Sequence, residues 1–273
     1  MENIHSLSCM RQQFVRRTIV SHCMKANYLI KNVVFKQIQK IRLILSAVWL
    51  VNRFSAFRYF ALNSIDIEIE KILSYDNGYF IEIGANNGVN QSNTLYFEKF
   101  KGWQGLLIEP HPKLFSQLHK NRSHKSVCIN SACTSFSYRN DSMKMMFSDL
   151  MTTSLEEFNI LPNSTDHAML GSKFLNGQPS EFIANSQTMQ QILVDVDAPK
   201  RIDLFSLDVE GSEFEVLSGI DHEMFRFSLI CVETSNIPKM IAFLTNLNYE
   251  LVKQVTHHDL FFMDKTLHRP LSV

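Results

Sequence analysis

The chain has 273 residues, of which 45% are hydrophobic and 20% are charged, the composition of a globular protein with room for one large core. Its formal charge is zero, but residues 1–65 carry ten Lys/Arg and one acid, whereas the rest carries 17 basic and 26 acidic residues. The acidic majority disfavours a nucleic acid as partner, and no segment reaches the ~18 apolar residues of a membrane span.

The pattern of residues 1–65 predicts a basic helical arm. From Ile30 to Val48 apolar residues recur at the spacing of one helix face. Four basic residues border this face: Lys31, Lys36, Lys40 and Arg42. Such a helix can dock on the protein's own core with its lysines extending to water. It can also make weak, salt-sensitive contact with a membrane surface, and the sequence leaves both alternatives open.

The pattern of residues 66–273 predicts an α/β domain in which strands and helices alternate. Strands are expected at 79–83, 106–109, 127–132, 202–208, 229–233, 249–255 and 260–263, and helices at 94–100, 113–121, 213–219 and 238–247. Alternation of this kind is typical of a mainly parallel sheet covered by helices on both faces. The last two strands are joined only by the short turn "THHD", and a connection so short suits antiparallel neighbours.

The stretch "YFIEIGANNGVNQSNT", residues 79–94, places the acid Glu82 in a strand that should be buried and follows it with Gly84 and Gly88. Asn-Gly is also a hairpin signal, but the polar and then helical residues after it favour a strand–loop–helix unit. Such a loop directs backbone N–H groups at a ligand above the carboxyl edge of the sheet. Neither the lysine of a phosphate loop nor the GxGxxG spacing of a dinucleotide loop is present.

A ligand that carries both an amino and a carboxylate group suits this loop best. Glu82 is expected to hold an ammonium, whose charge would make the buried acid tolerable, while loop N–H groups hold a carboxylate. Glu109 ends the next strand 27 positions later, where a carboxylate can accept both hydroxyls of a ribose. An amino acid joined to a ribose is S-adenosylmethionine, which is therefore the expected cofactor.

An ordered set of motifs runs through residues 76–263: the loop Gly84-Ala85-Asn86-Asn87-Gly88, Ser92-Asn93-Thr94, Trp103 with Gly105, Glu109-Pro110, Asn121-Arg122 and Asp208-Val209-Glu210-Gly211. This set closely resembles the FkbM family of S-adenosylmethionine-dependent methyltransferases. Two departures stand out. Family members often carry a lysine where Ser206 stands, and residues 152–190 match no family motif, so they form either a substrate lid or a long surface insertion.

The resemblance implies a class I methyltransferase fold, a Rossmann-like three-layer sandwich whose seven-stranded, mostly parallel sheet has an antiparallel last strand. It also implies methylation of a hydroxyl, commonly on a sugar, a polysaccharide or a polyketide. The expected cofactor-binding residues are Glu82, Gly84, Ala85, Asn86, Asn87, Gly88, Ser92, Asn93, Thr94, Glu109, Pro110 and Asp208.

Acids and histidines are expected to meet at the carboxyl edge of the sheet. Asp208 and Glu210 follow one central strand and Glu233 ends the next, while the turn before the last strand brings His257, His258 and Asp259 to the same edge. A sugar hydroxyl is a poor nucleophile, so a general base is useful. His258 or His257 is the first choice because the histidine pKa lies near neutrality. Asp208 is the second choice, and Glu210 lies beside it.

Structural alternatives remain open for this edge. Glu210 can instead cap the following helix, and the two histidines can belong to a solvated turn. Oxygen ligands from Asp208, Glu210 and Glu233, together with His258, could hold Mg²⁺, although strand-end carboxylates are common without metals and no metal is expected.

Two functions follow from these observations. The first is an S-adenosylmethionine-dependent O-methyltransferase that acts on a hydroxyl of a sugar, a polysaccharide or a related natural product. The alternative is a catalytically inactive, membrane-tethered binding module with the same fold. The five cysteines show no CxxC spacing, so reduced thiols and a cytoplasmic location are expected, with any membrane contact made through the arm.

Overall fold

The computed structural model describes residues 58–171 and 178–266. The chain divides into two units, 1–58 and 59–273, and only the second is described below. The predicted arm helix at 30–48 lies outside the described residues, and the predicted boundary at residue 65 stays a prediction. Among the described residues, no helix is long and apolar enough to cross a membrane.

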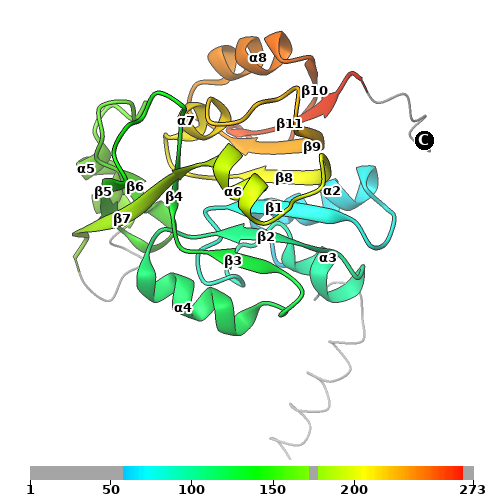
Figure 1. Ribbon diagram of the computed structural model, residues 1–273, viewed down its shortest axis with the longest axis horizontal. Helices are drawn as coiled ribbons and strands as arrows, with labels where there is room; N and C mark the ends of the chain where they lie inside the picture. Colours follow the sequence, from blue (N-terminus) through cyan, green and yellow to red (C-terminus); the bar gives the residue numbers. More distant parts are fainter. Residues whose placement is uncertain (1–57, 172–177, 267–273) are drawn as a thin grey trace, which may run out of the picture. The chain divides into compact units, whose positions relative to one another are not determined.

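A seven-stranded sheet in the order β10-β11-β9-β8-β1-β2-β3 forms the centre of the second unit (Figure 1). Neighbouring strands run parallel, except that β11 is antiparallel to both β9 and β10. The strands are β1 (Tyr79–Ile83), β2 (Gln104–Ile108), β3 (Val127–Ile129), β8 (Arg201–Leu207), β9 (Arg226–Glu233), β10 (Tyr249–Gln254) and β11 (Asp259–Asp264). The predicted seven-stranded sheet with an antiparallel last strand is confirmed.

Helices cover both faces of this sheet. The covering helices are α2 (Ile65–Ile72), α3 (Leu95–Phe100), α4 (Pro112–Asn121), α6 (Met189–Asp195), α7 (Glu213–Leu217) and α8 (Ile237–Asn246). The other helices are η2 (Leu62–Ser64), η3 (Asp149–Met151) and α5 (Ser164–Gly171), of which α5 contacts η3 and strands of a second sheet. Side chains alternate along β1, so that Phe80 packs with α2, α3 and α4 while Ile81 packs with α6, α7 and α8. Both residues are fully buried, as a strand covered on two faces requires.

The third strand differs from its prediction. Residues 127–132 were expected to form one strand, but β3 ends at Ile129 and the chain then leaves the main sheet. Ala132 begins β4 (Ala132–Thr134), which belongs to a second sheet in the order β4-β7-β5-β6. The chain changes sheets at the polar pair Asn130-Ser131, whose side chains bond to backbone carbonyls rather than to a continuing strand.

The second sheet is completed by β5 (Ser142–Phe147), β6 (Thr153–Ser154) and β7 (Ser180–Thr188). Met143, Met145 and Ala184 of this sheet form a small apolar cluster of their own with Ala132. Much of residues 152–190 therefore folds as β6, α5 and β7. The described part of this segment is packed structure beside the main sheet.

Candidate functional site

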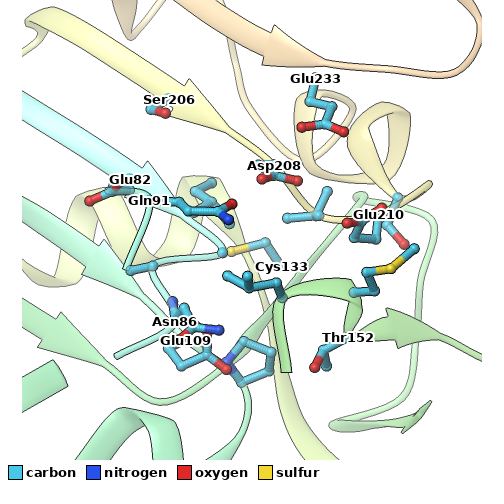
Figure 2. A pocket seen from close by; sticks show the side chains of 18 of the residues that line it. Glu82, Asn86, Gln91, Glu109, Cys133, Thr152, Ser206, Asp208, Glu210 and Glu233 are labelled. Atoms are coloured by element: carbon cyan, nitrogen blue, oxygen red, sulfur yellow. The ribbon is translucent and has the colours of Figure 1, made fainter. Parts of the chain in front are cut away.

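A cavity of about 270 Å³ opens where β1, β2, β8 and β9 end (Figure 2). The predicted residues that line it are Glu82, Gly84, Ala85, Asn86, Ser92, Asn93, Glu109, Pro110, Asp208, Glu210 and His258. The second sheet supplies apolar lining through Met143, Met145 and Cys133. Predicted site residues that do not line the cavity are Asn87, Gly88, Thr94 and His257. The carboxyl edge is thus where most of the predicted site residues meet.

The two glycines of the first loop make room for other parts of the protein. Gly84 has φ +82°, and a Cβ there would lie 1.9 Å from the carbonyl oxygen of Asp208. Gly88 has φ +78°, and its Cβ would lie 2.7 Å from Leu118 and 2.8 Å from Arg122 of the neighbouring helix end. The sequence suggested that a ligand approaches these glycines. For Gly88 the structure corrects this, because the space is filled by side chains at the end of α4.

The cation beside Glu82 is the guanidinium of Arg122, at 3.2 Å from Oε2. Ser92 and Thr94 donate their hydroxyls to the same oxygen, and the backbone N–H of Asn93 donates to Oε1 at 2.8 Å. The explanation that a ligand's cation makes this buried acid tolerable is therefore wrong. An intramolecular ion pair already does so, while Glu82 still lines the cavity.

The loop that follows β1 takes backbone conformations that non-glycine residues seldom adopt. Asn86 has φ 48° and Gln91 has φ 57°, and each such residue costs about 1–3 kcal/mol unless its surroundings hold it in place. The side chain of Asn86 donates to Asp149, and that of Asn93 donates to Ser206 at 3.0 Å. These bonds tie the loop to η3 and to β8.

Glu109 is buried directly after β2 and faces the loop. Its two oxygens accept the backbone N–H groups of Asn86, at 2.9 Å, and His111, at 2.8 Å. Burial raises the pKa of Glu109 to about 7, although the two N–H bonds oppose this change. Each carboxylate oxygen has a second lone pair, so Glu109 can still accept ligand hydroxyls from the cavity.

Unpaired acids gather on the other side of the cavity, at the ends of β8 and β9. Burial, and then the charges of Glu233 and Glu210, raise the pKa of Asp208 well above its usual range. The Oδ1 atom of Asp208 is buried and has no hydrogen-bond partner among the described residues. Burial, Glu210 and Asp259 raise the pKa of Glu233 to about 8. Both carboxylates therefore hold a proton more readily than an ordinary carboxylate does.

His258 joins this acidic group, whereas His257 does not. The Nε2 atom of His258 lies 3.4 Å from Oδ2 of Asp259 and 3.8 Å from Oε1 of Glu233. His257 is exposed, with its ring 3.9 Å from the ring of His258. Asp259 also accepts the hydroxyl of Thr256 at 2.5 Å, which fixes the turn. Of the two histidines, His258 is the one that lines the cavity.

Glu210 does not cap the following helix: the N-cap residue of α7 is Ser212, which makes no side-chain capping bond, and the N–H of Gly211 donates to Glu213. Instead, Oε2 of Glu210 lies 2.8 Å from Nε2 of His167, a residue of α5. The carbonyl of Glu210 accepts the hydroxyl of Thr153 at 2.7 Å. Sequence reasoning missed His167 because it lies in the segment without a family motif. A lone histidine in a polar stretch gives no signal of its partner.

The residues present fit the expected cofactor. S-adenosylmethionine carries a sulfonium and an ammonium, and the described lining residues include six acids but neither lysine nor arginine. Two groups of side chains also have ligand atoms within 4.8 Å of one another, namely Asp208, Glu210 and Glu233, and Glu233, His258 and Asp259. Their oxygen-rich composition would suit Mg²⁺, so the metal alternative stays open.

Comparison with known proteins gives a family match. The family model described as the methyltransferase FkbM domain matches residues 82–251. The crystal structure of methyltransferase FkbM from Methylobacillus flagellatus KT is similar, with a TM-score of 0.41, 11% identity, and coverage of 69% of this chain and 43% of that one. A second similar structure is precorrin-6y C5,15-methyltransferase from Geobacter metallireducens GS-15, with a TM-score of 0.36, 10% identity, and coverage of 73% and 85%.

The chain therefore spans less than half the length of the Methylobacillus protein. No curated protein matches the chain.

Proposed function

The chain belongs to the FkbM family of methyltransferases, and on this premise we propose that its S-adenosylmethionine-dependent reaction methylates a hydroxyl of a sugar, a polysaccharide or a related natural product. The observation that carries the proposal is the group formed by Asp208, Glu233 and His258 on one wall of the cavity. These are proton-accepting side chains, and a hydroxyl must lose its proton when it becomes methylated.

The cofactor, when bound, supplies a methyl group on a positively charged sulfur, and this methyl is open to attack by a nucleophile. Holding the acceptor at attacking distance provides much of the acceleration. Proton removal by a positioned base contributes about 10²–10⁴-fold more. The protein's own contribution is therefore to orient the hydroxyl and to take its proton.

Two side chains are suited to take this proton. Asp208 has a buried oxygen without a partner among the described residues and a raised pKa. His258 lines the cavity, and its Nε2 lies 3.8 Å from Glu233 and 3.4 Å from Asp259, so these two acids can hold the ring in a fixed orientation. His257 is exposed and is not needed for this role.

The other half of the cavity is suited to the cofactor. The backbone N–H groups expected to hold its carboxylate already donate within the protein, for example those of Gly84, Asn86 and Asn93. The side-chain amides of Asn90 and Gln91, which line the cavity, would face this carboxylate instead. Oε1 of Glu82, which accepts the N–H of Asn93, is the carboxylate oxygen less occupied by the protein and would face the ammonium. Glu109 would accept ribose hydroxyls. The lining also disfavours a phosphate or carboxylate acceptor, since the described lining residues include no basic side chain other than that of His258.

Titration calorimetry of the full chain with S-adenosylhomocysteine tests cofactor binding directly. We expect binding at micromolar concentration and, with an effective acceptor, methyl transfer to oxygen. A panel of neutral glycans, uronates and sugar phosphates then tests the acceptor class. Transfer only to nitrogen or only to anionic sugars would contradict the proposal, and binding without turnover on any acceptor would favour the inactive binding module.

The membrane contact proposed for the arm is tested separately, because residues 1–57 lie outside the described structure. Full-length chain should co-sediment weakly with anionic vesicles at low salt and dissociate at high salt. Equal recovery in the supernatant at both salt concentrations would leave docking on the protein's own core as the explanation.

A further inference from the structure

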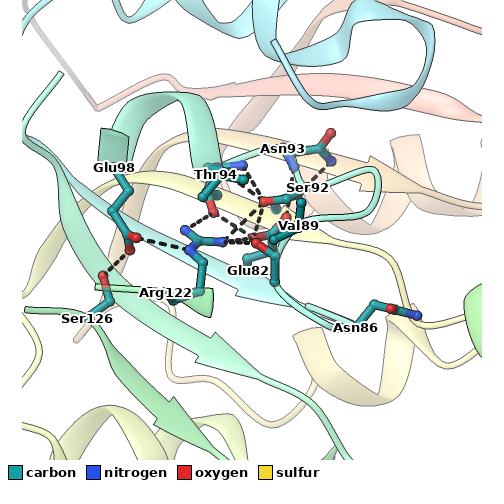
Figure 3. A network of polar contacts seen from close by, with 12 residues as sticks. Glu82, Asn86, Val89, Ser92, Asn93, Thr94, Glu98, Arg122 and Ser126 are labelled. Atoms are coloured by element: carbon teal, nitrogen blue, oxygen red, sulfur yellow. Dashed lines mark hydrogen bonds and ion pairs between the residues drawn. The ribbon is translucent and has the colours of Figure 1, made fainter. Parts of the chain in front are cut away.

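The side chain of Arg122 is fully buried, with 0% exposure, although it carries a permanent charge. Arg122 follows the last residue of α4, and its guanidinium extends beneath the loop after β1 (Figure 3). It forms ion pairs at 3.2 Å with Glu82 and with Glu98 of α3. A buried guanidinium thus links two carboxylates, and one of them, that of Glu82, lines the cavity.

The carboxylates that pair with Arg122 are themselves held in place. Glu98 accepts the backbone N–H of Ser123 at 2.9 Å and the hydroxyl of Ser126 at 2.6 Å. Because breaking one member of a buried charge network leaves the others uncompensated, each member fixes the position of the next. Glu82 is thus anchored through Arg122 to α3 and to the start of the α4–β3 connection.

Arg122 also holds the loop directly. It donates to the hydroxyl of Thr94 at 2.9 Å, to that of Ser92 at 3.2 Å and to the carbonyl of Gly88 at 3.3 Å. Between these contacts lies Gln91, whose positive φ must be maintained by its surroundings. The cavity-lining residues Asn90 to Asn93 therefore take their positions from a guanidinium that does not itself line the cavity.

We propose that Arg122 is a positioning residue for cofactor binding, which fixes Glu82 and the segment from Gly88 to Thr94 in the shape that receives the ligand. The inference rests on the proposed function only for the identity of that ligand. The fork of the guanidinium is essential to it, since a lysine ammonium cannot reach Glu82, Glu98 and Thr94 at once.

Hydrogen exchange of the ligand-free, full-length chain tests the positioning role without any cofactor. In Arg122→Met and Arg122→Lys, we expect amides of residues 84–94 to exchange about tenfold faster or more, while amides of β10 stay unchanged. The matched controls are Arg226→Met and Arg226→Lys. Arg226 is likewise buried and paired with an acid, Asp264, but its hydrogen bonds go to residues outside the loop, at 222, 247, 248 and 264. These controls should leave exchange at residues 84–94 as in the wild type.

Calorimetry with S-adenosylhomocysteine then links the loop to binding. We expect Arg122→Met to raise Kd about tenfold or more and the Arg226 variants to change it by less than about twofold. Thr94→Val, which removes one partner of Arg122 without burying a charge, should raise Kd about threefold to tenfold. If Arg122→Met fails to fold, the Kd of Thr94→Val for S-adenosylhomocysteine tests the inference in its place.

Wild-type exchange and wild-type Kd in a folded Arg122→Lys or Thr94→Val chain would overturn the inference. Equal effects from the Arg226 variants would also overturn it, because they would show a general loss of stability. If the wild-type chain binds no S-adenosylhomocysteine, the proposed function fails, while the exchange data still decide whether Arg122 positions the loop.

Discussion

The main sheet has an amino edge and a carboxyl edge, formed by the two ends of its parallel strands, and the buried acids at these edges have pKa values shifted in opposite directions. At the amino edge, Arg226 donates to Asp264 at 3.0 and 2.5 Å, and these bonds lower the pKa of Asp264 although burial alone would raise it. At the carboxyl edge, burial and neighbouring acids raise the pKa of Asp208 and Glu233. The strand β11 joins the edges, with Asp259 at one end and Asp264 at the other.

We take this difference to separate an acid that supports the fold from the acids proposed to act in the reaction. The amino-edge acid Asp264 is paired with an arginine and supports the fold, whereas Asp208 and Glu233 at the carboxyl edge have no lysine or arginine partner among the described residues and line a cavity. Unpaired buried acids cost stability, and they are kept where a ligand or a proton transfer uses them. Glu82 is an instructive exception, because it lies at the carboxyl edge but is paired with Arg122. Glu82 therefore both supports the loop through its ion pair and lines the cavity.

The largest expected effect concerns Asp208. Asp208→Asn should lower kcat by about 10²–10⁴-fold, because the amide cannot accept the hydroxyl proton. Its stability should be unchanged or higher, since an unpaired acid is removed. Asp264→Asn is the matched control at the amino edge and should leave kcat unchanged while lowering stability. A kcat for Asp208→Asn within about threefold of wild type would assign the proton to another base, with His258 next in line.

Removing the cation of the amino edge should have the next largest effect. Arg226→Met leaves Asp264 buried without its partner, which should lower the free energy of unfolding by about 3 kcal/mol. Denaturant titration measures this loss, and Kd for S-adenosylhomocysteine should stay as in the wild type. A higher Kd with unchanged stability would show that the amino edge takes part in binding. The proposed division between fold-supporting acids at one edge and reactive acids at the other would then be wrong.

A smaller effect is expected when one carboxylate oxygen becomes an amide. Glu109→Gln replaces an acceptor that faces the N–H of Asn86 or His111 by a donor. Kd for S-adenosylhomocysteine should rise about tenfold, which is about 1.4 kcal/mol. Asp203→Asn is the control at the amino edge, where Asp203 accepts the N–H of Tyr79 at 2.7 Å. It should affect stability alone, and equal Kd changes in both variants would contradict the role of Glu109.

The smallest expected effect is a pH dependence of opposite sign at the two edges. Glu233, with its pKa raised to about 8, stabilises the fold when protonated, and this contribution is lost as pH rises toward 8. The slope is at most about 1.4 kcal/mol per pH unit, and partial exposure should make it smaller. The lowered pKa of Asp264 gives stability that is present at neutral pH and lost in acid. Glu233→Gln should flatten the stability curve between pH 5 and 8, and an unchanged slope there would contradict the raised pKa.

The sequence predicted the main sheet well because its signals are local. The apolar run of β1 and the helix after the loop are both visible in a short window, and β1 has the predicted bounds, Tyr79–Ile83. The short turn before β11 was sufficient to predict an antiparallel last strand. Most of the predicted site residues meet at the cavity, because the carboxyl ends of parallel strands share one edge.

The sequence could not predict contacts between distant residues. Arg122 pairs with Glu82 across 40 positions, and a basic residue at a helix end more often reaches water. The pairing of the strands in the second sheet could not be predicted for the same reason. Its strand β7 pairs with β5 across a segment that lacks a family motif, and only the fold brings them together. The partner of Glu210, His167, lies in that segment as well.

The central claim is that the cofactor lies across the ends of β1 and β2, between the loop of residues 84–94, which Arg122 holds in place, and the acids Asp208 and Glu233. A crystal structure of the full chain with S-adenosylhomocysteine tests it most directly. The account predicts the ribose hydroxyls on Glu109, the amino-acid part against the loop from Gly84 to Asn93, and the sulfur facing Asp208. Density for the ligand at any other place, with Glu109 and Asp208 contacting only protein, would contradict the account.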